Sequence, residues 1–281
     1  MGSGTAHRTS ASRPATLLVG AGRMGSALLK GWIANGVAPL AAVEPNPSDA
    51  LKRFAKQNGV ALHASVDAVA DMPVTACVVA VKPQILRTEA VRLKPIARSG
   101  ALMVSIAAGT RIESLRNAWG RGARIIRAMP NTPGSIGRGI SALYAPRGIK
   151  RAEKSLAETL LAGLGPTVWV KNEHAIDIVT AVSGSGPAYV FLLVECLADA
   201  AETQGLPRAA AEQFARATIT GAGALLEADH RAPGELRRDV TSPGGTTEAA
   251  LNVLTKELPS LIARAVAAAC QRAEDLSGRA K

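Results

Sequence analysis

The sequence predicts two domains of different fold class, an α/β domain with a mostly parallel sheet over residues 15–171 and an all-α domain over residues 172–281. Short apolar runs alternate with helical patterns in the first part, which is typical of a parallel sheet with helices on both faces. Strand signals then end, and alanine-rich helical patterns continue to the C-terminus. The third indication is a glycine-rich turn directly after the first apolar run.

This turn contains Gly20, Gly22 and Gly25 in G-x-G-x-x-G spacing. The first glycine allows a tight turn, the second lets the backbone approach a pyrophosphate, and the third lets the next helix pack closely on the strand. The helix that begins near Arg23 and Met24 would offer free N–H groups and its positive dipole end to the phosphates. A purely structural glycine turn is the alternative, and the context must decide between the two.

The context is a β-α-β unit. A helical pattern follows the turn and stops at Asn35 and Gly36, and residues 40–43 then read as a second strand that ends in Glu44. An acid about 20 residues past such a turn usually binds ribose hydroxyls. The first domain is therefore predicted to be a Rossmann-type domain that binds a dinucleotide.

Further strands are expected at residues 60–62, 76–81, 102–106, 124–128, 140–144 and 167–170. In such sheets the ligand lies off the carboxyl ends of the strands. The segments that follow the fourth, fifth and sixth strands are therefore candidates for the mouth of the site, and they span residues 82–84, 107–110 and 129–133.

The second domain is expected to contain helices over about residues 175–204, 208–229, 233–239, 244–256 and 258–276. The first of these holds the small-residue segment 183–189, which either allows close helix packing or lines a ligand site. Amphipathic helices with alanine-rich faces carry more apolar surface than one small domain easily buries. The sequence therefore predicts a homodimer formed through this domain.

Composition limits the other classes of function. The net charge of +11 is spread over helices that also carry acids, and aromatic residues make up only 3% of the chain, which argues against a nucleic-acid-binding protein. The three cysteines form no C-x-x-C pair and the four histidines form no suggestive pair, so neither a disulfide framework nor a metal site is expected.

The expected location is the cytoplasm, without membrane attachment. The sequence shows no apolar run of the ~18 to 20 residues that a membrane span needs, and no signal-peptide core precedes residue 15. Residues 1–14 are polar and are predicted to form a disordered head.

Between two predicted helices, residues 241–247 read Thr-Ser-Pro-Gly-Gly-Thr-Thr and place four hydroxyls beside two bare amides. Gly244 and Gly245 can present their N–H groups at a helix start, where a carboxylate is favoured. The hydroxyls that could complete its hydrogen bonds belong to Ser242, Thr246 and Thr247. An ordinary Ser-Pro helix cap is the alternative for this segment.

Taken together, six segments resemble the pyrroline-5-carboxylate reductase family, which catalyses the last step of proline synthesis. They are GAGRMG at 20–25, AVKPQ at 80–84, SIAAG at 105–109, RAMPNTP at 127–133, SGSGPAY at 183–189 and VTSPGGTT at 240–247. The last two, in a helical half, separate this family from other Rossmann dehydrogenases. The resemblance runs from about residue 16 to about residue 276.

The resemblance implies an N-terminal nucleotide domain and a C-terminal dimerisation domain, with assembly into a decamer of five dimers in many members. It implies an active site where the nucleotide domain meets the helical domain of the dimer. There NADPH or NADH would deliver a hydride to C5 of L-Δ1-pyrroline-5-carboxylate, giving L-proline. The substrate carboxylate would be held by Ser242, Gly244, Gly245 and Thr246, and Thr247 would orient the ring nitrogen as the catalytic residue. The ribose and nicotinamide would be surrounded by Val81, Lys82, Pro83, Ala107, Gly109, Met129 and Asn131.

One departure from the family concerns the cofactor. The family commonly prefers NADPH and often has polar or basic residues after the second strand, where this chain has Glu44 followed by Pro-Asn-Pro. A carboxylate accepts hydrogen bonds from a ribose diol and repels a 2′-phosphate, whereas Arg23 and Asn46 could turn toward that phosphate. We therefore expect both cofactors to be used.

Alternative functions are reduction of another small cyclic imine, oxidation of a 3-hydroxy acid, or cofactor binding without turnover. The hydroxy-acid enzymes generally need a lysine on the first interdomain helix, where this chain has Ser183 and Ser185. A protein without turnover would not need the hydroxyl-rich loop.

Overall fold

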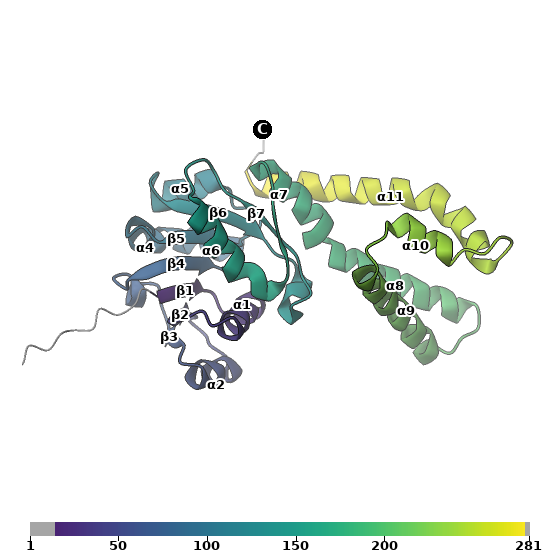
Figure 1. Cartoon of the computed structure of the whole chain (residues 1–281), viewed down its shortest axis with the longest axis horizontal. Coiled ribbons are helices and arrows are strands. Elements are labelled where there is room, and N and C mark those ends of the chain that lie inside the picture. Colours follow the sequence, from purple (N-terminus) through teal and green to yellow (C-terminus); the bar gives the residue numbers. More distant parts are fainter. Residues whose placement is uncertain (1–14, 279–281) are drawn as a thin grey trace, which may run out of the picture. The chain divides into compact units, whose positions relative to one another are not determined.

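The computed structural model describes residues 15–278, and the predicted disordered head, residues 1–14, lies outside them. The described chain forms two compact units (Figure 1). Unit 1 comprises residues 15–180 together with 273–278, and unit 2 comprises residues 181–272. The predicted domain boundary near residue 172 lies just before the helical run in which the chain passes from unit 1 to unit 2.

Unit 1 is built on one sheet of eight strands in the order β3-β2-β1-β4-β5-β6-β7-β8. All neighbours pair in parallel except β6 and β7, which are antiparallel, so the predicted mostly parallel sheet is confirmed. The strands are β1 (Ala15–Val19), β2 (Leu40–Val43), β3 (Ala61–His63), β4 (Val74–Val79), β5 (Leu102–Ser105), β6 (Arg124–Met129), β7 (Ser141–Tyr144) and β8 (Thr167–Trp169).

Helices cover both faces of this sheet because successive side chains of each buried strand point to opposite sides. Leu18 of β1 joins the core cluster under one helical layer, and Leu17 and Val19 join the cluster under the other. Each layer contains a fully buried tryptophan, Trp32 or Trp119, whose indole N–H donates to a backbone carbonyl. The first layer holds α1 (Arg23–Ala34), α2 (Asp49–Gln57) and α6 (Arg151–Leu161), and the second holds α3 (Pro83–Glu89), α4 (Lys94–Arg98) and α5 (Ile112–Trp119).

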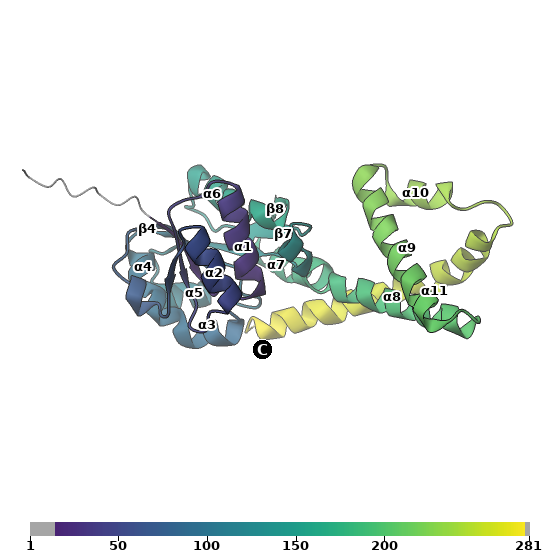
Figure 2. The ribbon, with the colours of Figure 1, turned by 90° about the horizontal axis from the view of Figure 1, so that it is seen from below.

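The helical part begins with α7 (Glu173–Val179), which continues through a π-helical segment (Thr180–Gly184) into α8 (Gly186–Thr203). Next come α9 (Arg208–Ala228) and the short α10 (Pro233–Asp239), which lies between α9 and the start of α11 in Figure 2. Two helices were expected over residues 244–276, but the structure has one, α11 (Thr246–Leu276), with Pro259 inside it. A proline removes a single backbone hydrogen bond, and the helix continues on the bonds of its other turns.

Unit 2 buries little apolar surface by itself. Helix α8 packs along α9, and the buried residues at this contact are Ala198, Ala211 and Ala215. Large apolar side chains lie exposed on α8, α9 and α11, among them Phe191 and Phe214, each with 63% of its surface accessible. Such a surface indicates an interface with another molecule.

The helical run Glu173–Thr203 corrects the expectation that no segment is apolar enough to cross a membrane. By length and composition alone, this run is long and apolar enough to cross a bilayer. The sequence shows no unbroken apolar run here because serines and glycines interrupt the apolar residues. In the structure one long helical run includes all of them.

Candidate active site

The glycine-rich turn has the conformation that its spacing predicts. Gly20 has φ +92, and a side chain there would collide with Val81 and with the Ala80 backbone at 2.8 to 3.0 Å. A Cβ on Gly25 would lie 2.0 Å from the carbonyl oxygen of Gly20, so α1 can begin this close to β1 only with glycine. These two glycines therefore fix the turn.

Gly22 has a different role, because a Cβ there would meet nothing within 4 Å. It is the N-cap residue of α1, and within the described chain no side chain caps this helix end. The first turn of α1 contains no acid, and Arg23 lies exposed there. An open glycine beside uncapped N–H groups is suited to bind an anion such as a pyrophosphate.

Glu44, at the carboxyl end of β2, lies against this turn. Its Oε2 accepts a hydrogen bond of 2.9 Å from the Ala21 N–H, and its Oε1 accepts one of 3.2 Å from the Asn46 N–H. A cavity of about 500 Å³ opens here, and the structure brings Gly20, Glu44, Asn46 and Val81 together at its wall. Sequence reasoning missed the other polar and charged residues of this wall, which are Ser65, Glu89 and Arg92.

The other predicted cofactor residues lie at or just after the ends of β4, β5 and β6, and the carboxyl ends of these strands lie at the same edge of the sheet as those of β1 and β2. None of them lines the cavity beside Glu44. Lys82 is the N-cap residue of α3, and Asn131 accepts a hydrogen bond of 3.0 Å from the Ile140 N–H. In strand order the edge runs from Glu44 through the glycine turn to Met129, so it offers an extended ligand a continuous row of loops.

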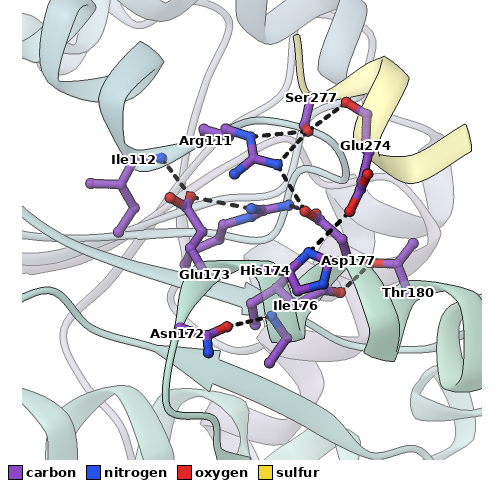
Figure 3. Close-up of polar contacts among 12 residues, drawn as sticks. Arg111, Ile112, Asn172, Glu173, His174, Ile176, Asp177, Thr180, Glu274 and Ser277 are labelled. Carbon is purple, nitrogen blue, oxygen red and sulfur yellow. Dashed lines mark hydrogen bonds and ion pairs between the residues drawn. The ribbon is translucent and has the colours of Figure 1, made fainter. Parts of the chain in front are cut away.

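The loop after β5 is anchored by a buried ionic cluster that the sequence reasoning did not find (Figure 3). Arg127 of β6 and Asp177 of α7 are each only 1% exposed and pair at 3.1 Å. Arg111, two residues past Gly109, donates to the second carboxylate oxygen of Asp177 at 2.9 Å. Both oxygens of this buried acid are therefore paired with arginines, which a buried charge requires.

The same cluster connects the two ends of the helical part to the sheet. Glu173, the first residue of α7, pairs with Arg127 at 3.1 Å and accepts a hydrogen bond of 2.7 Å from the Ile112 N–H. At the end of α11, Ser277 accepts hydrogen bonds from Arg111 at 2.8 and 3.0 Å, and Gly109 packs against Leu276. An arginine inside the apolar strand Arg124–Met129 was the available sequence signal, because such a residue needs a buried acid.

In unit 2, the hydroxyl-rich loop lies directly before α11. The Gly244 N–H donates to Glu248 Oε2 at 2.8 Å, and the Gly245 N–H donates to the Ser242 carbonyl at 3.0 Å. Both glycine amides thus have partners, the Ser242 carbonyl in the loop and the Glu248 carboxylate in the first turn of α11. Sequence reasoning missed Glu248, whose position two residues into α11 was the signal.

Residues 173–276 match the family described as pyrroline-5-carboxylate reductase dimerisation, and residues 16–109 match NADP oxidoreductase coenzyme F420-dependent. The pyrroline-5-carboxylate reductase of Pseudomonas aeruginosa is 38% identical over 95% of this chain and 98% of its own length. The chain belongs to the pyrroline-5-carboxylate reductase family.

Solved structures of the family agree with the fold. A pyrroline-5-carboxylate reductase from Coxiella burnetii has a TM-score of 0.85 at 35% identity, covering 93% of this chain and 98% of that one. The Plasmodium falciparum pyrroline carboxylate reductase with NADP bound has a TM-score of 0.79 at 28% identity, covering 95% and 99%. The Rossmann-type first domain and the helical dimerisation domain are thus confirmed.

As a member of the pyrroline-5-carboxylate reductase family, the chain is an oxidoreductase with a small-molecule substrate. The dimerisation match includes α8, α9 and α11, where the exposed apolar side chains of unit 2 lie. Family membership and the exposed surface both indicate an oligomer.

Proposed function

We propose that this chain reduces L-Δ1-pyrroline-5-carboxylate to L-proline in proline biosynthesis, with NADPH or NADH as the hydride donor. The proposal rests on the 38% identity between this chain and the Pseudomonas aeruginosa reductase over 95% of the chain. This span includes both the glycine turn of unit 1 and the hydroxyl-rich loop of unit 2. Neither segment alone would distinguish the family.

The cofactor would be held along the carboxyl edge of the sheet. The uncapped start of α1 and the open Gly22 accept the pyrophosphate, beside Arg23, Met24 and Gly25. The bound cofactor supplies the hydride that adds to C5 of the imine. The residues assigned to its ribose and nicotinamide are Val81, Lys82, Pro83, Ala107, Gly109, Met129 and Asn131.

The substrate carboxylate would be held at the start of α11. In the structure a carboxylate already accepts from the Gly244 N–H, and it belongs to Glu248. The substrate would replace Glu248 there and extend to Gly245, Thr246 and the Ser242 hydroxyl.

Thr247 follows one residue into α11, and its side chain is half-buried. We assign its hydroxyl to the ring nitrogen. A cyclic imine carries its own proton in water, so the residues need to position the ring rather than supply a strong acid.

Replacing the Thr247 hydroxyl tests the substrate site. Thr247→Ala should lower kcat/KM for the imine about tenfold, as the loss of one hydrogen bond of about 1.4 kcal/mol would. Thr255→Ala is the matched control, because Thr255 lies on the same helix and its hydroxyl bonds to the Leu251 carbonyl. Unchanged steady-state kinetics in Thr247→Ala would remove Thr247 from the mechanism.

The assembly we propose is a homodimer formed through the helical domain, with five dimers in a decamer, in the cytoplasm. The apolar run Glu173–Thr203 falls within the segment that matches the dimerisation family, so a second copy rather than lipid would cover it. Light scattering of the purified protein measures the number of subunits. The same preparation should neither bind vesicles nor shift DNA at low salt.

A further inference from the structure

The Glu44 carboxylate has a fixed position at the adenosine end of the proposed cofactor site. The N–H groups of Ala21 and Asn46 bond to its two different oxygens, at 2.9 and 3.2 Å. A carboxylate has about four acceptor positions, so positions remain for further donors. Ribose hydroxyls can donate to them, whereas the oxygens of a dianionic phosphate cannot.

The charged side chains that line the cavity with Glu44 do not offset its negative charge. Glu89 lines the same cavity, and so does Arg92. Arg92 is already paired with two acids, Glu89 at 3.3 Å and Asp67 at 3.7 Å. The charged side chains of this wall and their direct partners therefore include three acids and one arginine.

The start of α2, which follows Glu44 in the chain, is also closed to a phosphate. The Ser48 hydroxyl accepts from the Leu51 N–H at 3.2 Å and caps the helix. Asp49 adds an acid to the first turn and pairs with Lys52 at 3.2 Å. By contrast, α1 has no side-chain cap, and its exposed Arg23 belongs to the pyrophosphate end of the site.

We infer that Glu44 makes this chain prefer NADH to NADPH, because it holds a fixed negative charge where the ribose 2′-phosphate of NADPH would lie. The inference rests on the proposed function, since it concerns the hydride donor of that reaction. Repulsion between the partly exposed Glu44 carboxylate and the 2′-phosphate should make NADPH binding at least about tenfold weaker than NADH binding.

The test is a fluorescence titration of the full-length protein with NADH and with NADPH, without imine, for the wild type and for Glu44→Gln. The wild type should bind NADH more tightly, and the difference should shrink at high salt because the repulsion is screened. In Glu44→Gln the ratio of the two Kd values should fall about tenfold. Glu44→Ser, which also removes the charge, should shift the ratio in the same direction and provides a second folded variant.

Glu113→Gln is the charge-matched control, because Glu113 is an exposed acid on α5, away from the cavity wall. It should leave the ratio unchanged. Equal or tighter binding of NADPH by the wild type overturns the inference, and so does an unchanged ratio in folded Glu44→Gln. A wild type that binds NADH preferentially yet fails to oxidise it with the imine supports the inference and contradicts the proposed function.

Discussion

The two units differ in how they bury apolar side chains. Unit 1 covers both faces of its sheet, and its core holds Trp32, Trp119 and a series of leucines and isoleucines. In unit 2 the buried residues are all alanines, namely Ala181, Ala198, Ala211 and Ala215. Full burial of one large apolar side chain stabilises a fold by about 1.5 to 3 kcal/mol. Unit 2 of a single chain therefore lacks most of the stabilisation that buried apolar side chains give unit 1.

Unit 2, rather than unit 1, depends on assembly to bury its apolar side chains. Unit 1 carries the cofactor edge on a sheet that is complete within one chain. Unit 2 carries the hydroxyl-rich loop on helices whose large apolar side chains remain exposed. We therefore expect the substrate loop, rather than the cofactor site, to lose its function when the oligomer is disrupted.

Introducing a charge on the exposed face of α8 should have the largest effect. Phe191 is 63% exposed on that helix. Because Phe191→Glu would bury an unpaired carboxylate from each subunit, it should raise the dissociation constant of the dimer by a factor on the order of a thousand or more. Analytical ultracentrifugation measures this constant, and NADH titration of the same sample should still show cofactor binding.

The control for that variant lies in unit 1. Val168 is 50% exposed on β8, an edge strand of the sheet, so Val168→Glu introduces the same charge at a similarly exposed position. It should leave the dimer intact. If the two variants sediment alike, the proposed role of α8 in the interface is wrong.

Removing the buried acid of unit 1 should have the next largest effect. Asp177→Ala leaves Arg127 buried without one of its partners, which should lower the free energy of unfolding by about 3 to 5 kcal/mol. Urea denaturation followed by tryptophan fluorescence reports on Trp32 and Trp119 of this unit. Asp49→Ala removes an acid that is 81% exposed and should leave the transition unchanged; equal shifts in the two variants would show that burial does not matter here.

The smallest expected effect is the pH dependence of stability that comes from the buried thiol of Cys77 in unit 1. Burial raises the pKa of Cys77 from 9.0 to about 12, because the thiolate is poorly solvated in the core of unit 1. The protonated thiol therefore stabilises the folded state fully below about pH 9, and this contribution is lost as the pH rises toward 12. Unfolding free energies measured across this range should fall, and a Cys77→Ala protein should lack that component.

Thiol labelling gives an independent check that side chains are buried in unit 1 and exposed in unit 2 of a single chain. At pH 8 the native protein should not react at Cys77, whereas Cys196 is exposed on α8 within a single chain. Faster labelling of Cys196 in the Phe191→Glu variant than in the wild type would place α8 in the interface. Rapid native-state labelling of Cys77 would contradict the packed core of unit 1.

Features set by local sequence could be predicted, and features set by distant contacts could not. The strands and the glycine turn depend on adjacent residues, so the apolar runs and the three glycines located them. The ionic cluster joins Arg111 to Ser277 and Arg127 to Asp177, pairs far apart in the sequence. Periodicity carries no information about such pairs.

In the helical half, too, the sequence did not predict every feature of the structure. Pro259 favours a helix boundary, yet α11 continues through it because the backbone hydrogen bonds of the other turns remain. The hydroxyl-rich loop was located correctly at a helix start, but the partner of the Gly244 N–H was not predicted. A capping carboxylate at Glu248 and a substrate carboxylate satisfy the same donor, and the sequence does not choose between them.

The most direct test of the proposed function follows the absorbance of NADH or NADPH with L-Δ1-pyrroline-5-carboxylate as the substrate of the purified protein. The six-membered homologue serves as the control substrate, and chromatography identifies the product. We expect cofactor oxidation with equimolar formation of L-proline, and slower turnover of the homologue. Binding of the cofactor without any oxidation, or faster turnover of the six-membered imine, would contradict the proposed reduction of L-Δ1-pyrroline-5-carboxylate.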